Sequence, residues 1–184
     1  MQPEALMLYK LIVLYILDRV DFPMTNSQLA DFITEKEYTN YFNVQQVLNE
    51  LVDDGYISLQ EAAKNSYLYR ITKDGKETLS FFYKNISRNI RDDIDMFLTE
   101  KQYALREEVS NIADYYESKT NEYVCELKVI ERDTVIIEIR LTVPTEDNAK
   151  TICAHWRQNN ADIYAYVINV LLSNGSAPGG EDRS

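Results

Sequence analysis

Apolar residues recur along this chain with two periods, one typical of helices and one typical of strands. Between Leu6 and Val20 they occupy nearly every position, which predicts a helix that is apolar on almost all sides. One small core covers only a single stripe of such a helix. We therefore expect the remaining face to be buried in a two-fold dimer or against the C-terminal part of the same chain.

The segment from Met24 to Leu79 combines both periods in one order. Thr25 and Gln28 have the spacing of a capping box, so a helix begins at Thr25. After a polar break, apolar residues at helical spacing predict a second helix that ends at Asp54-Gly55. Two strands and a third helix follow, at Ile57–Glu61, at Tyr67–Ile71 and after the capping residue Thr72. This order predicts a winged helix-turn-helix, a fold that most often places its second helix in a DNA major groove.

Two motifs in this segment resemble those of known families. The run Tyr67-Leu-Tyr-Arg-Ile-Thr-Lys-Asp-Gly-Lys-Glu-Thr-Leu79 is similar to the wing-to-helix segment of PadR-like and MarR-like transcriptional regulators. Leu48-x-x-Leu51-x-x-x-Gly55-x-Ile57 is similar to the end of their recognition helix. To about Leu172 the chain most resembles a family of uncharacterised bacterial winged-helix proteins with an added C-terminal α/β domain, through Tyr41-Phe-Asn-Val-Gln-Gln46, Ala113-Asp-Tyr-Tyr116, Leu141-Thr-Val-Pro144, Ile152-Cys153 and Trp156. The resemblance implies a DNA-binding regulator.

The C-terminal half predicts a small sheet covered by helices. A long helix capped by Ser87 precedes three candidate strands, which are Asn111–Glu117, Glu122–Glu131 and Thr134–Val143. In an antiparallel meander, one register would set Glu126 against Arg140 and Lys128 against Glu138, and opposite charges favour it.

A last helical pattern begins after Thr145 and carries an apolar stripe that fits one sheet face, made of Ala149, Ile152, Cys153 and Trp156. After Asn159-Asn160, the residues up to 172 fit either a further helix or a strand. We thus predict an α+β fold with an N-terminal winged helix-turn-helix domain at residues 1–84. A small C-terminal domain at residues 85–172, with a three-stranded antiparallel meander packed by helices, would serve dimerisation, effector binding or docking. A disordered tail follows at residues 173–184.

Amide side chains make up the polar face of the predicted reading helix. Asn and Gln carry the donor and acceptor needed for a bidentate contact with adenine in double-stranded DNA. The candidate DNA-binding residues are Lys36, Asn40, Tyr41, Asn43, Gln45, Gln46, Asn49, Lys64, Asn65 and Ser66. The same amides also fit a solvated helix face that binds nothing, and both interpretations stay open.

The charge balance argues against binding of nucleic acid. The 184 residues include 19 Lys and Arg against 30 Asp and Glu, a net charge of −11, and the reading helix from Tyr41 to Asp54 has no Lys or Arg. The nearby cations are Lys36, Lys64, Arg70, Lys73 and Lys76. We therefore expect weak DNA binding by one subunit that a homodimer strengthens. The alternative is a winged helix used only for protein contacts.

Other chemistry is sparse. A single histidine, His155, excludes a His-pair metal site, and the chain has no phosphate-cradling glycine loop or nucleophile motif. We expect no metal, no cofactor and no enzymatic activity, although an enzyme in the C-terminal domain stays a third alternative. The tyrosines at 115, 116, 123, 164 and 166 fit either a pocket for a small-molecule effector or the edge of a core.

Two features bear on the compartment. Cys125 and Cys153 lie in apolar patterns typical of buried free thiols in a reducing environment. The apolar run Leu11–Leu17 is too short to cross a membrane, and its flanking charges do not fit a signal peptide. We expect a cytoplasmic protein with no membrane contact.

Overall fold

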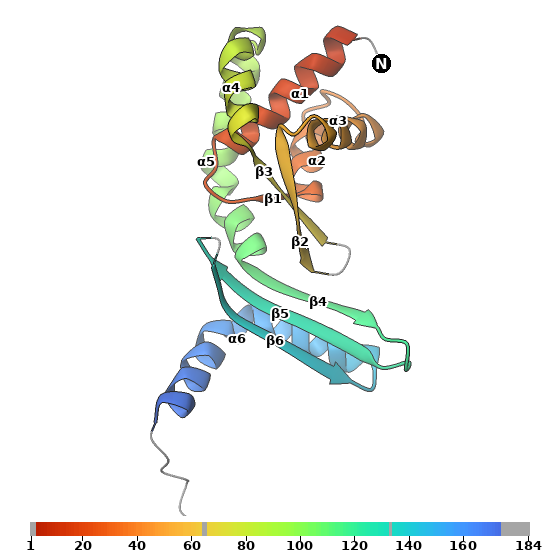
Figure 1. The fold of residues 1–184 in the computed structure, drawn as a ribbon, viewed down its shortest axis with the longest axis vertical. Helices are drawn as coiled ribbons and strands as arrows, with labels where there is room; N and C mark the ends of the chain where they lie inside the picture. Colours follow the sequence, from red (N-terminus) through yellow and green to blue (C-terminus); the bar gives the residue numbers. More distant parts are fainter. Residues whose placement is uncertain (1–2, 64–65, 133, 174–184) are drawn as a thin grey trace, which may run out of the picture. The chain divides into compact units, whose positions relative to one another are not determined.

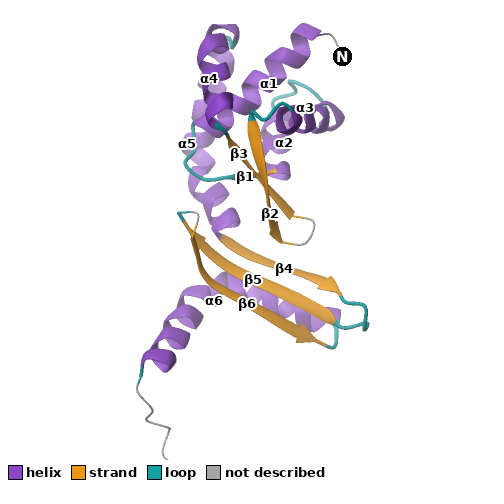
Figure 2. Cartoon of the chain, in the orientation of Figure 1, coloured by secondary structure: helices purple, strands orange, loops and turns teal. Residues whose placement is uncertain are grey.

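The computed structural model describes residues 3–63, 66–132 and 134–173. In chain order its elements are α1 (Pro3–Asp18), β1 (Met24–Thr25), α2 (Asn26–Glu35), α3 (Tyr41–Asp53), β2 (Ile57–Ala63), β3 (Ser66–Ile71), α4 (Lys73–Phe82), the 3₁₀ turn η1 (Tyr83–Asn85), α5 (Arg88–Ser110), β4 (Asn111–Glu117), β5 (Tyr123–Glu131), β6 (Thr134–Val143) and α6 (Glu146–Leu172). The fold is α+β, with helices around two three-stranded antiparallel sheets (Figures 1 and 2).

The chain divides into two compact units. Unit 1 comprises residues 1–112 and 130–134, and unit 2 comprises residues 113–129 and 135 onward. The long helix α5 belongs to unit 1, where Ile94, Phe97 and Leu98 are buried in the main core.

Side-chain caps begin the helices where the sequence predicts them. The Thr25 hydroxyl accepts a hydrogen bond from the Gln28 backbone N–H, and Gln28 Oε1 accepts one from the Thr25 backbone N–H, which confirms the capping box. The side-chain oxygens of Thr72, Ser87 and Thr145 cap α4, α5 and α6, and each accepts one hydrogen bond from a backbone N–H of the first turn. These short-range signals therefore define most helix starts correctly.

The sheet of unit 1 has the order β1-β3-β2. Met24 and Thr25 of β1 pair with Tyr69 and Leu68 of β3, so a two-residue strand joins the hairpin formed by β2 and β3. The predicted wing tip at Lys64 and Asn65 lies outside the described residues, as does the predicted tail beyond Ser173.

Helix α1 does not keep a free apolar face in its central part. All seven residues from Leu11 to Leu17 are at most 5% exposed, because α3, α4, α5 and β3 surround them. No dimer partner is therefore needed to cover this stretch, and part of the cover comes from α5, which lies within the C-terminal domain expected at residues 85–172.

Unit 2 consists of the sheet β4-β5-β6 with α6 against one face. The predicted ion pairs across β5 and β6 are both present, with Arg140 Nη2 2.7 Å from Glu126 Oε1 and Lys128 Nζ 3.5 Å from Glu138 Oε1. Ala149, Cys153 and Trp156 of α6 pack on Ala113, Cys125 and Leu127 of the sheet. The predicted apolar stripe is thus the contact face of α6.

One continuous helix replaces the break expected at Asn159-Asn160. Asn159 Nδ2 donates to the His155 carbonyl at 2.9 Å, and Asn160 Nδ2 donates to the Trp156 carbonyl at 3.1 Å. Because each amide bonds back to the preceding turn, neither residue ends the helix. The strand alternative for the following residues is wrong, since α6 runs to Leu172.

The two cysteines are free and buried inside unit 2, at 0% exposure for Cys125 and 4% for Cys153. Burial raises the pKa of both thiols, that of Cys153 to about 11, and so disfavours the reactive thiolate at neutral pH. We expect no reaction of the native protein with an aromatic disulfide reagent at pH 7.5, but two equivalents of released chromophore after denaturation. Rapid release from the native protein would contradict this burial.

Candidate nucleic-acid interface

Helix α3 is held in unit 1 by one apolar side. Val44, Val47, Leu48 and Leu51 are buried in the main core, so the opposite side of the helix faces outward. Phe42, Gln46 and Asn49 are exposed and recur at i, i+4 and i+7, which puts them on one face. Phe42 is 82% exposed, an unusual position for a phenylalanine.

The start of α3 is fixed by its own polar residues. Asn40 is the N-cap, and its Oδ1 accepts from the Asn43 backbone N–H at 3.0 Å. Asn43 Nδ2 donates to Thr39 Oγ1 at 2.7 Å. Two of the four predicted DNA-binding asparagines, Asn40 and Asn43, therefore already stabilise the turn before the helix. Tyr41 beside them is half exposed, and its ring contacts that of Phe42.

Gln45 faces α2. Its amide exchanges two hydrogen bonds with the amide of Asn26, each 2.7 Å long. This reciprocal pair uses one donor and one acceptor on each side and ties α3 to the first turn of α2. A base contact by Gln45 would therefore compete with this contact between helices, whereas one by Gln46 would compete with a bond to Glu50 inside α3.

The acidic end of α3 is partly neutralised from α1. Lys10 Nζ lies 2.9 Å from a carboxylate oxygen of both Glu50 and Asp54. Gln46 Nε2 also donates to Glu50 Oε1 at 2.9 Å. The hydrogen bonds from Lys10 and then Gln46 lower the pKa of Glu50, so this carboxylate stays ionised and paired.

The surroundings of α3 are acidic. Residues 24–63 contain one cation, Lys36, whose Nζ lies 3.5 Å from Asp93 Oδ1. The anions in the same range are Asp31, Glu35, Glu37, Glu50, Asp53, Asp54 and Glu61. Of the remaining candidates, Ser66 begins β3 and is half-buried, and Lys64 and Asn65 lie outside the described residues. Phosphate contacts near α3 must therefore come from very few groups.

The turn between α2 and α3 is anchored by tyrosines. Tyr38 Oη donates to Asp93 Oδ2 at 2.7 Å, and Tyr9 Oη donates to the Tyr38 carbonyl at 2.8 Å. Burial, followed by this contact with Asp93, raises the pKa of Tyr38 to about 12. The turn is thus linked to both α1 and α5.

Sequence reasoning missed three residues of this surface. Phe42 had a signal, since its spacing to Gln46 and Asn49 is helical. Lys10 and Asn26 gave no such signal, because their contacts with α3 join residues that are 19 or more positions apart in the sequence.

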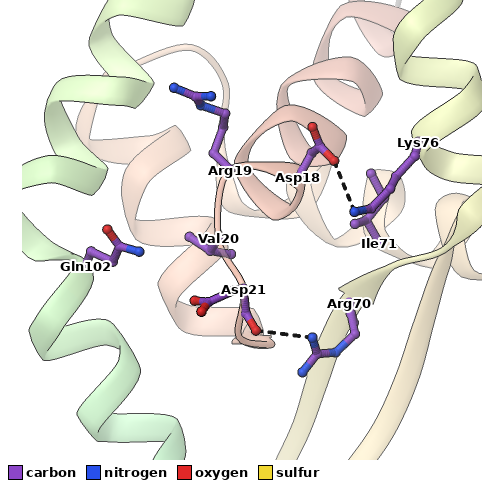
Figure 3. A pocket seen from close by; sticks show the side chains of 8 residues that line it. All are labelled: Asp18, Arg19, Val20, Asp21, Arg70, Ile71, Lys76 and Gln102. Carbon is purple, nitrogen blue, oxygen red and sulfur yellow. Dashed lines mark hydrogen bonds and ion pairs between the residues drawn. The ribbon is translucent and has the colours of Figure 1, made fainter. Parts of the chain in front are cut away.

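A separate hollow of about 500 Å³ opens in unit 1 beside the end of α1 (Figure 3). Its lining residues are Asp18, Arg19, Val20, Asp21, Arg70, Ile71, Lys76 and Gln102. Lys76 Nζ lies 3.5 Å from Asp18 Oδ1, Arg70 Nη1 donates to the Asp21 carbonyl at 3.4 Å, and Arg19 pairs with Asp95. An anionic ligand here would have to displace these contacts, so the hollow is a weak candidate for an effector site.

Two of the five candidate effector tyrosines lie side by side in unit 2. Tyr115 and Tyr123 lie with ring centroids 6.3 Å apart, and Tyr115 Oη donates to Glu146 at 3.0 Å. Tyr164 and Tyr166 lie on the outer half of α6, where Tyr166 is largely exposed. None of the five lines the hollow in unit 1.

The fold and this surface define an α+β protein in which the first nine residues of α3 present amides and no charge. Among the described helices, none has the length and apolar character needed to span a membrane. The chain belongs to the family described as a domain of unknown function, DUF4364, whose model matches residues 9–171 and so includes residues of both units. No curated protein and no solved structure matches the chain.

Proposed function

We propose that this protein is a transcriptional regulator that binds double-stranded DNA as a homodimer, with unit 1 as a winged helix-turn-helix and α3 as its reading helix. The element order α1-β1-α2-α3-β2-β3 and the sheet order β1-β3-β2 support this assignment. A regulator of this kind acts in the cytoplasm, which agrees with two buried free thiols.

The observation that carries the proposal is the outward face of α3. The first nine residues of the helix, Tyr41 to Asn49, include no charged side chain, and the exposed ones offer two aromatic rings and two amides. Amides can form bidentate contacts with adenine, and such a helix meets the DNA with its N-terminal part. Lys10 reduces the repulsion that Glu50 and Asp54 would exert on phosphates.

The contacts of α3 also divide its amides by role. Gln46 and Asn49 are the expected base-reading residues. Gln45 instead positions α3 through Asn26, and Asn40 and Asn43 hold the helix start.

A second candidate function is protein docking through the same surface. Residues 24–63 contain seven anions and one cation, which favours docking, because protein surfaces that bind nucleic acid are usually basic. In that case Phe42 and Tyr41 would insert into a partner and no duplex would bind.

The two candidates separate in a binding assay. A target would be recovered by selection from fragmented genomic DNA, and fluorescence anisotropy would compare it with a scrambled duplex in low and moderate salt. We expect the wild-type protein to prefer the target. Gln46→Ala with Asn49→Ala should remove that preference, because each lost bidentate contact costs about 1–3 kcal/mol of discrimination, with little change in salt dependence.

A matched control removes two exposed amides elsewhere, by Asn89→Ala with Gln158→Ala. This variant should bind like the wild type. If the wild-type protein binds neither duplex in low salt, DNA binding is wrong and docking becomes the better account.

A further inference from the structure

The two halves of α6 differ in what covers them. From Glu146 to about Asn160 the helix packs on the sheet, and Ile163 is the last of its residues that contacts the described core of unit 2. Figures 1 and 2 show the remaining turns extending past the sheet edge. In these last turns Val167 and Ile168 are half-buried, and the other residues from Tyr164 to Ser173 are exposed.

The apolar stripe of α6 nevertheless continues through both halves. Ala149, Cys153 and Trp156 repeat at spacings of four and three, and the same register passes Asn160 and then reaches Ile163, Val167 and Val170. Apolar positions at alternating spacings of three and four are typical of helices that pack along another helix. The stripe therefore outlasts the sheet that covers its first half.

The uncovered segment is apolar around its other sides as well. Between 37% and 76% of the surface of each of five large side chains is exposed, and these are Tyr164, Tyr166, Val170, Leu171 and Leu172. Tyr166 and Val170 lie one turn apart on the side of the stripe, and the other three lie on the remaining sides of the helix. Single exposed apolar residues are ordinary on a monomer, whereas exposed apolar residues that gather in one segment mark an interaction site.

Charge indicates what covers it. Residues 163–172 contain no charged side chain, in a protein with net charge −11. Two copies repel each other over most of their surface, and this segment is where they can meet without facing like charges. An anionic membrane surface is disfavoured, because residues 158–172 also contain no Lys or Arg.

We infer that the outer half of α6, residues 163–172, packs against the same segment of a second copy of this chain. The contact rests on the homodimer of the proposed function and names the surface that forms it. In a two-fold dimer the same surface of each subunit faces its copy. Because residues 163–172 carry no charge, this arrangement places no like charges opposite each other. The pairing would hold two reading helices in one assembly.

Sedimentation velocity at about 50 µM without DNA tests this contact. We expect a dimer for the wild-type protein. Tyr166→Glu with Val170→Glu sets two carboxylates per chain on one face of the segment, and should raise the dissociation constant of the dimer by about 100-fold or more. Both side chains are exposed, so circular dichroism should show an unchanged fold.

The matched control is Ala154→Glu with Gln158→Glu, which adds the same two charges at the same spacing on the exposed side of the first half of α6. It should remain a dimer. A monomeric wild type, or a dimer that the Tyr166 and Val170 variant does not weaken, overturns the inference. So does a monomer that cosediments with neutral phosphatidylcholine vesicles, which would make the segment a membrane contact. Anisotropy on the same samples tests DNA binding separately, since a monomer can still bind a duplex and a dimer can fail to.

Discussion

Gly75→Ala is expected to destabilise unit 1 by on the order of 3 kcal/mol. A Cβ at Gly75 would lie 2.1 Å from the Tyr56 carbonyl oxygen and 3.0 Å from Ile71 Cγ1. The Tyr56 oxygen cannot move away cheaply, because it accepts hydrogen bonds from both the backbone N–H and the hydroxyl of Thr72. The first turn of α4 would have to shift, and Thr72 caps that turn.

Gly55→Ala is the matched control for this experiment. Gly55 has φ of +73°, but nothing lies within 4 Å of an added Cβ, so only the left-handed backbone penalises alanine, by about 1 kcal/mol. Urea unfolding followed by far-ultraviolet circular dichroism would measure both variants. If both variants lose the same free energy of unfolding, the close approach of α4 to the Tyr56 carbonyl is not the reason why position 75 requires glycine.

The same glycine illustrates what sequence can give. It lies inside the run from Tyr67 to Leu79 that resembles regulator wings, yet the reason for a glycine there is a backbone carbonyl 19 residues earlier. Caps such as Thr25 and Thr72, and the alternation of β6, were predictable because each depends on neighbours within a few residues. The set of elements that bury α1 was not predictable, since these four elements meet only in the folded unit.

The candidate site shows the same difference between local and long-range information. The spacing of the apolar residues in α3 predicted a polar face that carries amides. Which amides are available was not predictable, because Asn26 takes up Gln45 through a contact between two helices. Asn159 and Asn160 gave a misleading signal for a related reason. Asparagine favours helix ends, but inside α6 both side chains bond back to carbonyls four residues earlier.

The core of unit 2 explains why one residue dominates its stability. Among the described residues its buried cluster has six members, which are Ala113, Cys125, Leu127, Ala149, Cys153 and Trp156. Trp156 is the largest of them and only 2% exposed. Trp156→Ala should therefore cost on the order of 3 kcal/mol or more, through lost burial and a cavity that small neighbours cannot fill.

The indole N–H separates packing from hydrogen bonding in this loss. Within the described part of the chain, the buried Trp156 Nε1 has no hydrogen-bond partner, so replacement by phenylalanine removes volume but no hydrogen bond. Trp156→Phe should thus lower the melting temperature clearly less than Trp156→Ala does, as measured by thermal unfolding followed by circular dichroism. The single tryptophan of the wild type should also emit at short wavelength, as expected for a dry site. A water-like emission maximum, with a melting temperature that Trp156→Ala leaves unchanged, would mean that α6 does not pack on the sheet through this side chain.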